Sequence, residues 1–389
     1  MLLIKNAKIH TMAKEGVIDG WILIENGKIV QMGEGEPSLQ GSEVLDASGK
    51  MVFPGFIDAH CHIGMWEEGI GFEGADGNEM TDPITPHLRA VDAINPLDEA
   101  FGNALKGGVT TAATGPGSAN VIGGTFVVMK LVGNRVDDMV IKGDASMKVA
   151  FGENPKRVYA EKKVLPTTRM GTAGALRETL ARTIAYHEKK KAAEEDATKL
   201  PIYDAKLEAM IPVIRGEMPL KAHAHRTDDI FTAIRIAKEF NLRLTLEHCT
   251  EGHLIADHLA REGYPAIIGP TFGSKSKFEL NKKTFDTPRI LVEAGVKIAI
   301  MTDSPVIPLE YLPMCAALAF KSGLDETEAL KAITINAAEI LELGHRLGSI
   351  ENGKDADLVI WDRHPFDLQA SVEHTLVDGK VVYTREKKQ

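Results

Sequence analysis

Short apolar runs alternate with helical periods along most of this 389-residue chain. In segments such as 228–240 and 251–263 the apolar residues recur every three or four positions, which is typical of amphipathic helices. Between such segments lie apolar runs of strand length, at 108–115, 146–154, 219–225, 242–249, 264–270 and 296–305. This alternation predicts an α/β fold with a parallel sheet, and at this length it predicts a (β/α)8 barrel of the TIM type.

One stretch departs from the alternation. Residues 126–133 and 136–143 are strand-like, and no long helical period lies between 108–115 and 146–154. We therefore expect the third βα unit of the barrel to be truncated or replaced by hairpin-like strands.

The two ends of the chain share a different sequence pattern. Apolar strands around glycine-bearing turns fill 2–12, 20–33 and 43–52, and the same style returns at 355–362 and 374–384. We expect both termini to pair into one small β-sandwich. This predicts a composite β domain from residues 1–53 and 347–389, and a barrel from residues 54–346.

The charge balance limits the classes of partner. A formal net charge of −10 and a pI near 5.8 leave no basic field for nucleic acid or an anionic membrane, so a small-molecule substrate fits better. Charges interrupt the apolar residues at the N-terminus, and no segment is apolar over the length of a membrane span. Three scattered cysteines suit a reducing compartment, so we expect a cytoplasmic protein. Assembly into a homo-oligomer stays open.

Histidines and one aspartate follow the predicted strands. His60 and His62 are one residue apart at the end of an apolar run, and residues i and i+2 of a strand point to the same side. His223, His248 and Asp303 come at the ends of later strands. Because the carboxyl ends of barrel strands converge on one face, these side chains predict a site for one or two divalent transition-metal ions, with zinc as the first choice.

The chain resembles a known family at these positions. The motifs FPGFIDAHCHIG, GVTTA, KAHAH, LEHCTEG, MTDSP and GSIENGKDADLVIWD are similar to those of the metal-dependent amidohydrolase superfamily, nearest to its imidazolonepropionase-related branch. The resemblance implies that His60 and His62 bind the more buried ion, that His223 and His248 are ligands on strands five and six, and that Asp303 binds metal and moves protons. His225 points the same way as His223, so it contacts substrate or replaces His223 as the ligand.

The bridging ligand stays open between two residues. The resemblance offers Lys148, as a carboxylated lysine, or Glu153, as a carboxylate at a strand end. Five residues apart, they fall on opposite faces of a regular strand, so at most one is a ligand unless Gly152 kinks the chain. Glu153 is favoured here because a short carboxylate at the rim suffices.

These ligands predict hydrolysis of an amide-type C–N bond by metal-activated hydroxide, with Asp303 as general base and acid and with metal and a histidine, His248, stabilising the oxyanion. The alternatives are a mononuclear deaminase of an amino-heterocycle and a non-catalytic scaffold that kept the fold. Loops after the strands are expected to carry Arg157, Arg169 and Lys277. Arg169 is the expected anchor for a substrate carboxylate, because a guanidinium binds a carboxylate bidentately.

Overall fold

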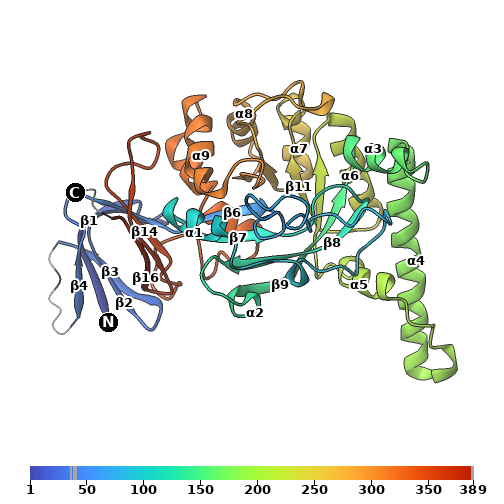
Figure 1. The fold of residues 1–389 in the computed structure, drawn as a ribbon, viewed down its shortest axis with the longest axis horizontal. Helices are drawn as coiled ribbons and strands as arrows, with labels where there is room; N and C mark the ends of the chain where they lie inside the picture. The colour runs from blue at the N-terminus through green and yellow to red at the C-terminus, as the bar shows by residue number, and fades with distance from the viewer. Residues whose placement is uncertain (36, 38–41, 387–389) are drawn as a thin grey trace.

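Two sheets and a long helix give the molecule its shape. The computed structural model describes residues 1–35, 37 and 42–386. A small sheet that holds both chain ends lies at one end, the barrel lies in the centre, and the helix α4 extends past the barrel at the other end (Figure 1). Among the described residues, no helix is both long and apolar enough to cross a membrane.

Eight strands form the barrel sheet, in the order β13–β12–β11–β10–β9–β8–β7–β6. Their bounds are Phe56–Cys61 (β6), Val109–Thr114 (β7), Ile122–Lys130 (β8), Val140–Ala150 (β9), Leu220–Ala224 (β10), Leu244–His248 (β11), Ala266–Ile268 (β12) and Ile298–Ile300 (β13). Nearly all of their residues are buried, which is typical of a sheet covered on both sides. The predicted barrel-type fold is confirmed.

The third unit departs from the barrel pattern, as predicted. Strand β8 pairs antiparallel with both β7 and β9, whereas the other neighbours in the sheet are parallel. The links at 115–121 and 131–139 are shorter than the dozen or more residues that a parallel crossover needs. The chain therefore reverses direction here as a meander.

Helices cover the outside of the barrel and its ends. The α-helices are Glu99–Lys106 (α1), Val136–Met139 (α2), Glu153–Glu161 (α3), Arg169–Glu195 (α4), Ala205–Ile214 (α5), Thr227–Glu239 (α6), Ala256–Glu262 (α7), Thr287–Glu293 (α8), Leu312–Lys321 (α9), Glu326–Lys331 (α10) and Ile335–Ile340 (α11). Short 3₁₀ helices lie at Ala90–Asp92 (η1), Ala197–Lys199 (η2), Gly252–Leu254 (η3), Phe278–Leu280 (η4) and Leu309–Tyr311 (η5).

A buried carboxylate joins the first and last barrel strands. Oδ1 of Asp58 accepts the backbone N–H of His60 at 2.9 Å, and Oδ2 accepts the backbone N–H and the hydroxyl of Thr302 at 2.9 and 2.6 Å. The N–H of His62 then donates to the carbonyl oxygen of Ser304 at 2.8 Å. Burial raises the pKa of Asp58 to about 7 against these hydrogen bonds. The contacts hold the end of β6 beside the loop that follows β13.

The two chain ends pair into one sheet, as predicted. The order is β16–β15–β14–β5–β1–β2–β3, and β4 pairs with β1. The bounds are Leu2–His10 (β1), Val17–Glu25 (β2), Lys28–Glu34 (β3), Glu43–Asp46 (β4), Met51–Pro54 (β5), Leu358–Trp361 (β14), Val372–Val377 (β15) and Lys380–Thr384 (β16). All eight strands are hydrogen-bonded into a single sheet with a core cluster of its own. Residues 36, 38–41 and 387–389 of the predicted β domain lie outside the described residues.

Lys130 ties the barrel to this sheet. Its Nζ lies 2.9 Å from Asp355, 3.0 Å from Asp357 and 2.5 Å from Asp378, and its side chain is only 6% exposed. Burial raises the pKa of Asp357 to about 6, although Lys130 opposes that shift. The ammonium therefore neutralises two buried carboxylates, Asp355 and Asp357, together with the exposed Asp378.

We predict that Lys130→Met lowers the free energy of unfolding by about 3–5 kcal/mol at pH 7.5, because it removes the ammonium that pairs with the buried Asp357, whereas Asp355 keeps Lys28 and Arg346. The pKa of Asp357 in the folded protein is raised above its ordinary value, to about 6. Stability is therefore lost as the pH rises from the ordinary pKa through the raised one, because Asp357 ionises while it is buried. The loss should therefore shrink at pH 4.5, where Asp357 is protonated. Denaturant unfolding at both pH values measures this. Lys142→Met, which removes a partly exposed pair with Glu342, should cost under about 1 kcal/mol; equal losses in the two variants would contradict the prediction.

Candidate metal centre

Two groups of ligand-type side chains meet at the carboxyl ends of the barrel strands. Among the described residues, His60, His62 and Asp303 form one group, and His223, His225 and His248 form the other. Within each group the ligand atoms lie within 4.8 Å of one another. The His60 and His248 rings, 5.6 Å apart, connect the two groups. The strand ends predicted from sequence thus converge.

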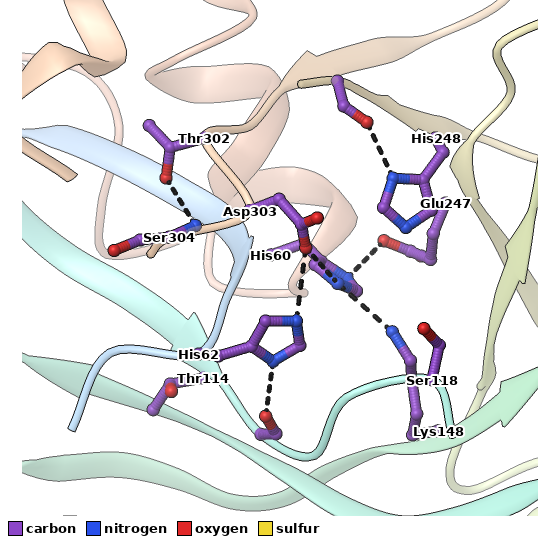
Figure 2. Close-up of polar contacts among 12 residues, drawn as sticks. His60, His62, Thr114, Ser118, Lys148, Glu247, His248, Thr302, Asp303 and Ser304 are labelled. Atoms are coloured by element: carbon purple, nitrogen blue, oxygen red, sulfur yellow. Dashed lines mark hydrogen bonds and ion pairs between the residues drawn. The ribbon is translucent and has the colours of Figure 1, made fainter. Parts of the chain in front are cut away.

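The first group has its imidazoles held from behind. Nδ1 of His60 lies 2.8 Å from Oε2 of Glu247, and Nδ1 of His62 donates to the carbonyl oxygen of Gly115 at 2.7 Å. Both partners accept hydrogen bonds only, so the neutral rings carry their proton on Nδ1 and a lone pair on Nε2. Those Nε2 atoms face Oδ1 of Asp303, at 3.5 Å from His60 and 3.2 Å from His62 (Figure 2).

This arrangement fits a cation. Burial lowers the pKa of His60 to about 3, and the charge of the nearby Lys148 is the second cause of this shift. A second proton on that ring is therefore disfavoured. Oδ1 of Asp303 faces the same two Nε2 atoms, and neutral rings protonated on Nδ1 offer this carboxylate no hydrogen bond. Two imidazole lone pairs therefore face an ionised carboxylate, and a metal ion between them satisfies all three.

The second group packs three buried histidines. The ring centroids of His223, His225 and His248 are 4.4–4.7 Å apart. Nδ1 of His248 donates to the carbonyl oxygen of Gly269 at 2.7 Å, and Nδ1 of His225 lies 2.7 Å from the hydroxyl of Thr250. Within the described part of the chain, neither ring nitrogen of His223 has a hydrogen-bond partner. Burial lowers the pKa of all three, to about 4 for His248, so the rings are neutral as metal ligation requires.

Backbone strain re-aims two of these side chains. His248 has φ of +71° and Asp303 has φ of +56°, values that non-glycine residues rarely adopt. In regular strand geometry Glu247 and His248 would point to opposite faces. The left-handed residue breaks that alternation, so both side chains reach the barrel interior.

Lysines and a glutamate carry charge inside the barrel. Lys148, Lys221 and Glu247 are each at most 1% exposed. Nζ of Lys221 lies 3.1 Å from Glu247 and donates to the carbonyl oxygen of Ala59 at 2.9 Å. Nζ of Lys148 lies 3.2 Å from Nε2 of His60, and burial lowers the pKa of Lys148 to about 7. Lys148 therefore sits against the first group.

The structure does not bring Glu153 into either group. Gly152 has φ of +82°, so the chain turns away from β9 and Glu153 becomes the first residue of α3. Its Oε2 accepts the backbone N–H of Glu279 at 3.4 Å. Glu279 itself lies much closer to the histidines, with Oε1 3.6 Å from Nε2 of His223 and 3.5 Å from Nε2 of His225.

The residues predicted to bind substrate lie in different elements of the structure. Arg157 and Arg169 were expected on loops, and that placement is wrong, because they lie in α3 and α4. Both oxygens of Asp229 accept from Nε of Arg169 at 3.0 Å, so this guanidinium already has a carboxylate partner. Lys277 does lie on a loop, and its Nζ is 2.6 Å from Oε1 of Glu279.

One cavity of about 570 Å³ opens over both groups. His62, Lys148 and Asp303 line it together with all three histidines of the second group. Lys277 and Lys283 add positive charge, and Trp66, Phe272 and Ile307 add apolar wall. Arg157 and Arg169 are not among its described lining residues. The space suits a small ligand with polar and apolar parts.

Sequence reasoning did not identify Lys221, Glu247 or Glu279. Lys221 lies two residues before His223 on the same strand, so both side chains point to the same face of that strand. This spacing could have indicated that Lys221 lies inside the barrel. Glu247 shows no such signal, because a regular strand would place it on the face opposite His248, and the left-handed backbone at His248 breaks that alternation. Glu279 lies in a loop, where only the tertiary structure brings it to the histidines.

Comparisons with known proteins agree with this fold. An amidohydrolase tasK from Hapsidospora irregularis is 30% identical over 97% of this chain, which spans 42% of the length of that protein. An imidazolonepropionase from Treponema denticola is 25% identical, with 98% of this chain and 97% of that protein covered. The crystal structure of an amidohydrolase from Thermotoga maritima superposes with a TM-score of 0.96 at 45% identity, covering 99% of this chain and 100% of that one.

The family model described as the amidohydrolase family matches residues 51–384, which include both ligand groups and the last strands of the terminal sheet. The resemblance predicted from the motifs is confirmed. The chain therefore belongs to the amidohydrolase family, a family of hydrolases that act on carbon–nitrogen bonds.

Proposed function

We propose that this chain is a metal-dependent hydrolase that cleaves the amide-type C–N bond of a small substrate bearing a carboxylate. The observation that carries the proposal is the pair of buried ligand groups, members of which line one cavity. The imidazolonepropionase named among the relatives supports a small substrate of this kind.

Each ligand group would hold one divalent ion, for which zinc is our first choice. Bound there, such an ion lowers the pKa of a water molecule from about 15.7 toward about 7 and polarises a carbonyl oxygen. The contact between Lys148 and His60, together with the place of Lys148 in the cavity wall, supports Lys148 in carboxylated form as the bridge. The turn at Gly152, which leads Glu153 away, argues against Glu153.

Asp303 is the group best placed to move protons. Its side chain is 14% exposed, whereas His60 behind it is fully buried, so the carboxylate meets the cavity while it faces the histidines. Asp303 takes the proton from the attacking water and delivers it to the leaving nitrogen. The hydrogen bond from Nδ1 of His248 to Gly269 leaves a lone pair on its Nε2, which supports a ligand role for His248 rather than donation to an oxyanion.

A mononuclear deaminase of an amino-heterocycle is the weaker candidate. It would use four of these residues only, namely His60, His62, His223 and Asp303. Three packed imidazoles support a second ion instead, because one of them has no hydrogen-bond partner at either nitrogen among the residues that the structure describes. The geometry thus favours the binuclear hydrolase.

A cationic loop over the cavity supports the proposal that the substrate bears a carboxylate. Lys277 and Lys283 both line the cavity, and Lys275 lies on the same loop. Burial, and then the charge of Lys275, lowers the pKa of Lys283. The loop therefore carries more positive charge than its own partners neutralise, and an anionic substrate group is attracted to it.

We predict that Lys148→Met reduces the bound metal from two ions toward one per chain, because the bridge is lost, while Glu153→Gln keeps both ions. Metal analysis of the purified variants by plasma mass spectrometry measures this, with the wild type as reference. The reverse result, loss in Glu153→Gln and retention in Lys148→Met, would return the bridging role to Glu153.

Asp303→Asn should keep the fold and most of the metal but lower kcat by at least about a thousandfold, because the amide cannot take up the proton. Steady-state kinetics on a substrate found by screening N-acyl amino acids, dipeptides and cyclic amides measures this, together with metal content. Retained turnover would assign proton transfer to another group.

Lys277→Met should raise KM for an acidic substrate by about tenfold to a hundredfold, the loss expected for one charge-assisted contact. KM for the corresponding neutral amide should not change. Arg169→Met is the control, because Arg169 is paired with Asp229 and is not among the described residues that line the cavity, whereas Lys277 is, and it should discriminate little between acid and amide. An equal effect of Lys277→Met on both substrates would remove the carboxylate from the proposal.

A further inference from the structure

Glu279 is a buried carboxylate that the proposed chemistry leaves unassigned. It lies in η4, on the loop that follows β12, and is 1% exposed. Its Oε1 has no hydrogen-bond partner of acceptable geometry among the described residues. Burying a carboxylate is costly unless charge or hydrogen bonds compensate it, so its surroundings should explain it.

One oxygen of Glu279 is held from the backbone. Oε2 accepts the N–H of Glu153 at 3.0 Å, at the first residue of α3. Gly152 makes room for this contact, because a Cβ at that position would lie 2.7 Å from Oε2, and its φ of +82° disfavours any other residue. The carboxylate is therefore fixed in one orientation by a backbone shaped to receive it.

The other oxygen faces the second histidine group. Oε1 lies 3.6 Å from Nε2 of His223 and 3.5 Å from Nε2 of His225, both too long for hydrogen bonds. Two ligands that share a tetrahedral zinc ion at about 2.1 Å lie roughly 3.4 Å apart. The first group shows similar separations, 3.2 and 3.5 Å, between Asp303 and its two histidines. Glu279 thus lies at about the same distance from two histidines of the second group as Asp303 does from the two histidines of the first group.

We propose that Glu279 is the carboxylate ligand of an ion bound by His223, His225 and His248. The inference rests on the proposed function, since it requires metal at the second group. It gives each ion one protein carboxylate, which offsets part of the dication's charge in a buried site.

Lys277 offers the competing explanation. Its Nζ is 2.6 Å from Oε1 of Glu279, so the carboxylate could serve only to hold this lysine over the cavity. The two roles differ in what Lys277→Met does to metal binding. If Glu279 is a ligand, removing the ammonium leaves metal affinity equal or higher, whereas Glu279→Gln lowers it.

Equilibrium dialysis of the full-length protein against a series of buffered free Zn²⁺ concentrations tests this, with bound zinc measured per chain. We expect two ions in the wild type and, in Glu279→Gln, at least about a tenfold to hundredfold higher Kd for one of them. Lys277→Met should not weaken either ion. Glu251→Gln is the matched control, because this glutamate accepts the N–H of Thr227 instead of facing the histidines, and it should bind as the wild type.

Wild-type zinc affinity in Glu279→Gln, or the same loss in Lys277→Met, would overturn this inference alone. A wild type that binds no zinc would overturn the proposed function as well. If Glu279→Gln does not fold, as judged by circular dichroism, Glu279→Asp gives the same test: the shorter carboxylate should weaken one ion, and unchanged binding would overturn the proposal.

Discussion

Imidazole lone pairs and carboxylates face one another, largely buried, at the carboxyl ends of the barrel strands. His60 and His62 approach Asp303 at 3.5 and 3.2 Å, and each imidazole is fixed in place by an acceptor behind it. In a medium of low polarity, acceptors opposed to acceptors are unfavourable unless positive charge lies between them. The two ligand groups therefore fit a cation, and the surrounding structure holds their side chains in place.

That support extends through the barrel interior. Lys221 neutralises Glu247, Glu247 orients His60, and Asp58 ties the backbone of His60 to Thr302, next to Asp303. Each of these groups is buried, so each needs its partner to avoid an uncompensated charge or polar group. In this barrel core, charged and polar groups take the place of part of the apolar packing. They hold the residues that carry the chemistry in fixed positions.

The irregular parts of the chain serve the same site. The antiparallel β8 shortens the third unit, so Lys148 on β9 lies beside Lys221 in the sheet register. Positive φ angles at Gly152, His248 and Asp303 re-aim the chain where a regular strand end would point the wrong way. The loop that carries Lys277 and Glu279 closes over the same volume. Some of the chain's departures from ideal geometry thus lie where the ligands meet.

The amino-acid pattern by itself determined the barrel, the sheet shared by both termini, the irregular third unit and the positions of His60, His62, His223, His225, His248 and Asp303. These features follow from strand periodicity and from the rule that parallel strands converge at their carboxyl ends. The tertiary structure alone placed Lys148 against His60, turned Glu153 away into α3, paired Arg169 with Asp229, and brought Glu279 to the histidines. Those outcomes depend on single backbone turns, such as that at Gly152, and on contacts between loops distant in sequence. No local periodicity records such contacts, because they arise only when the strands have closed the barrel.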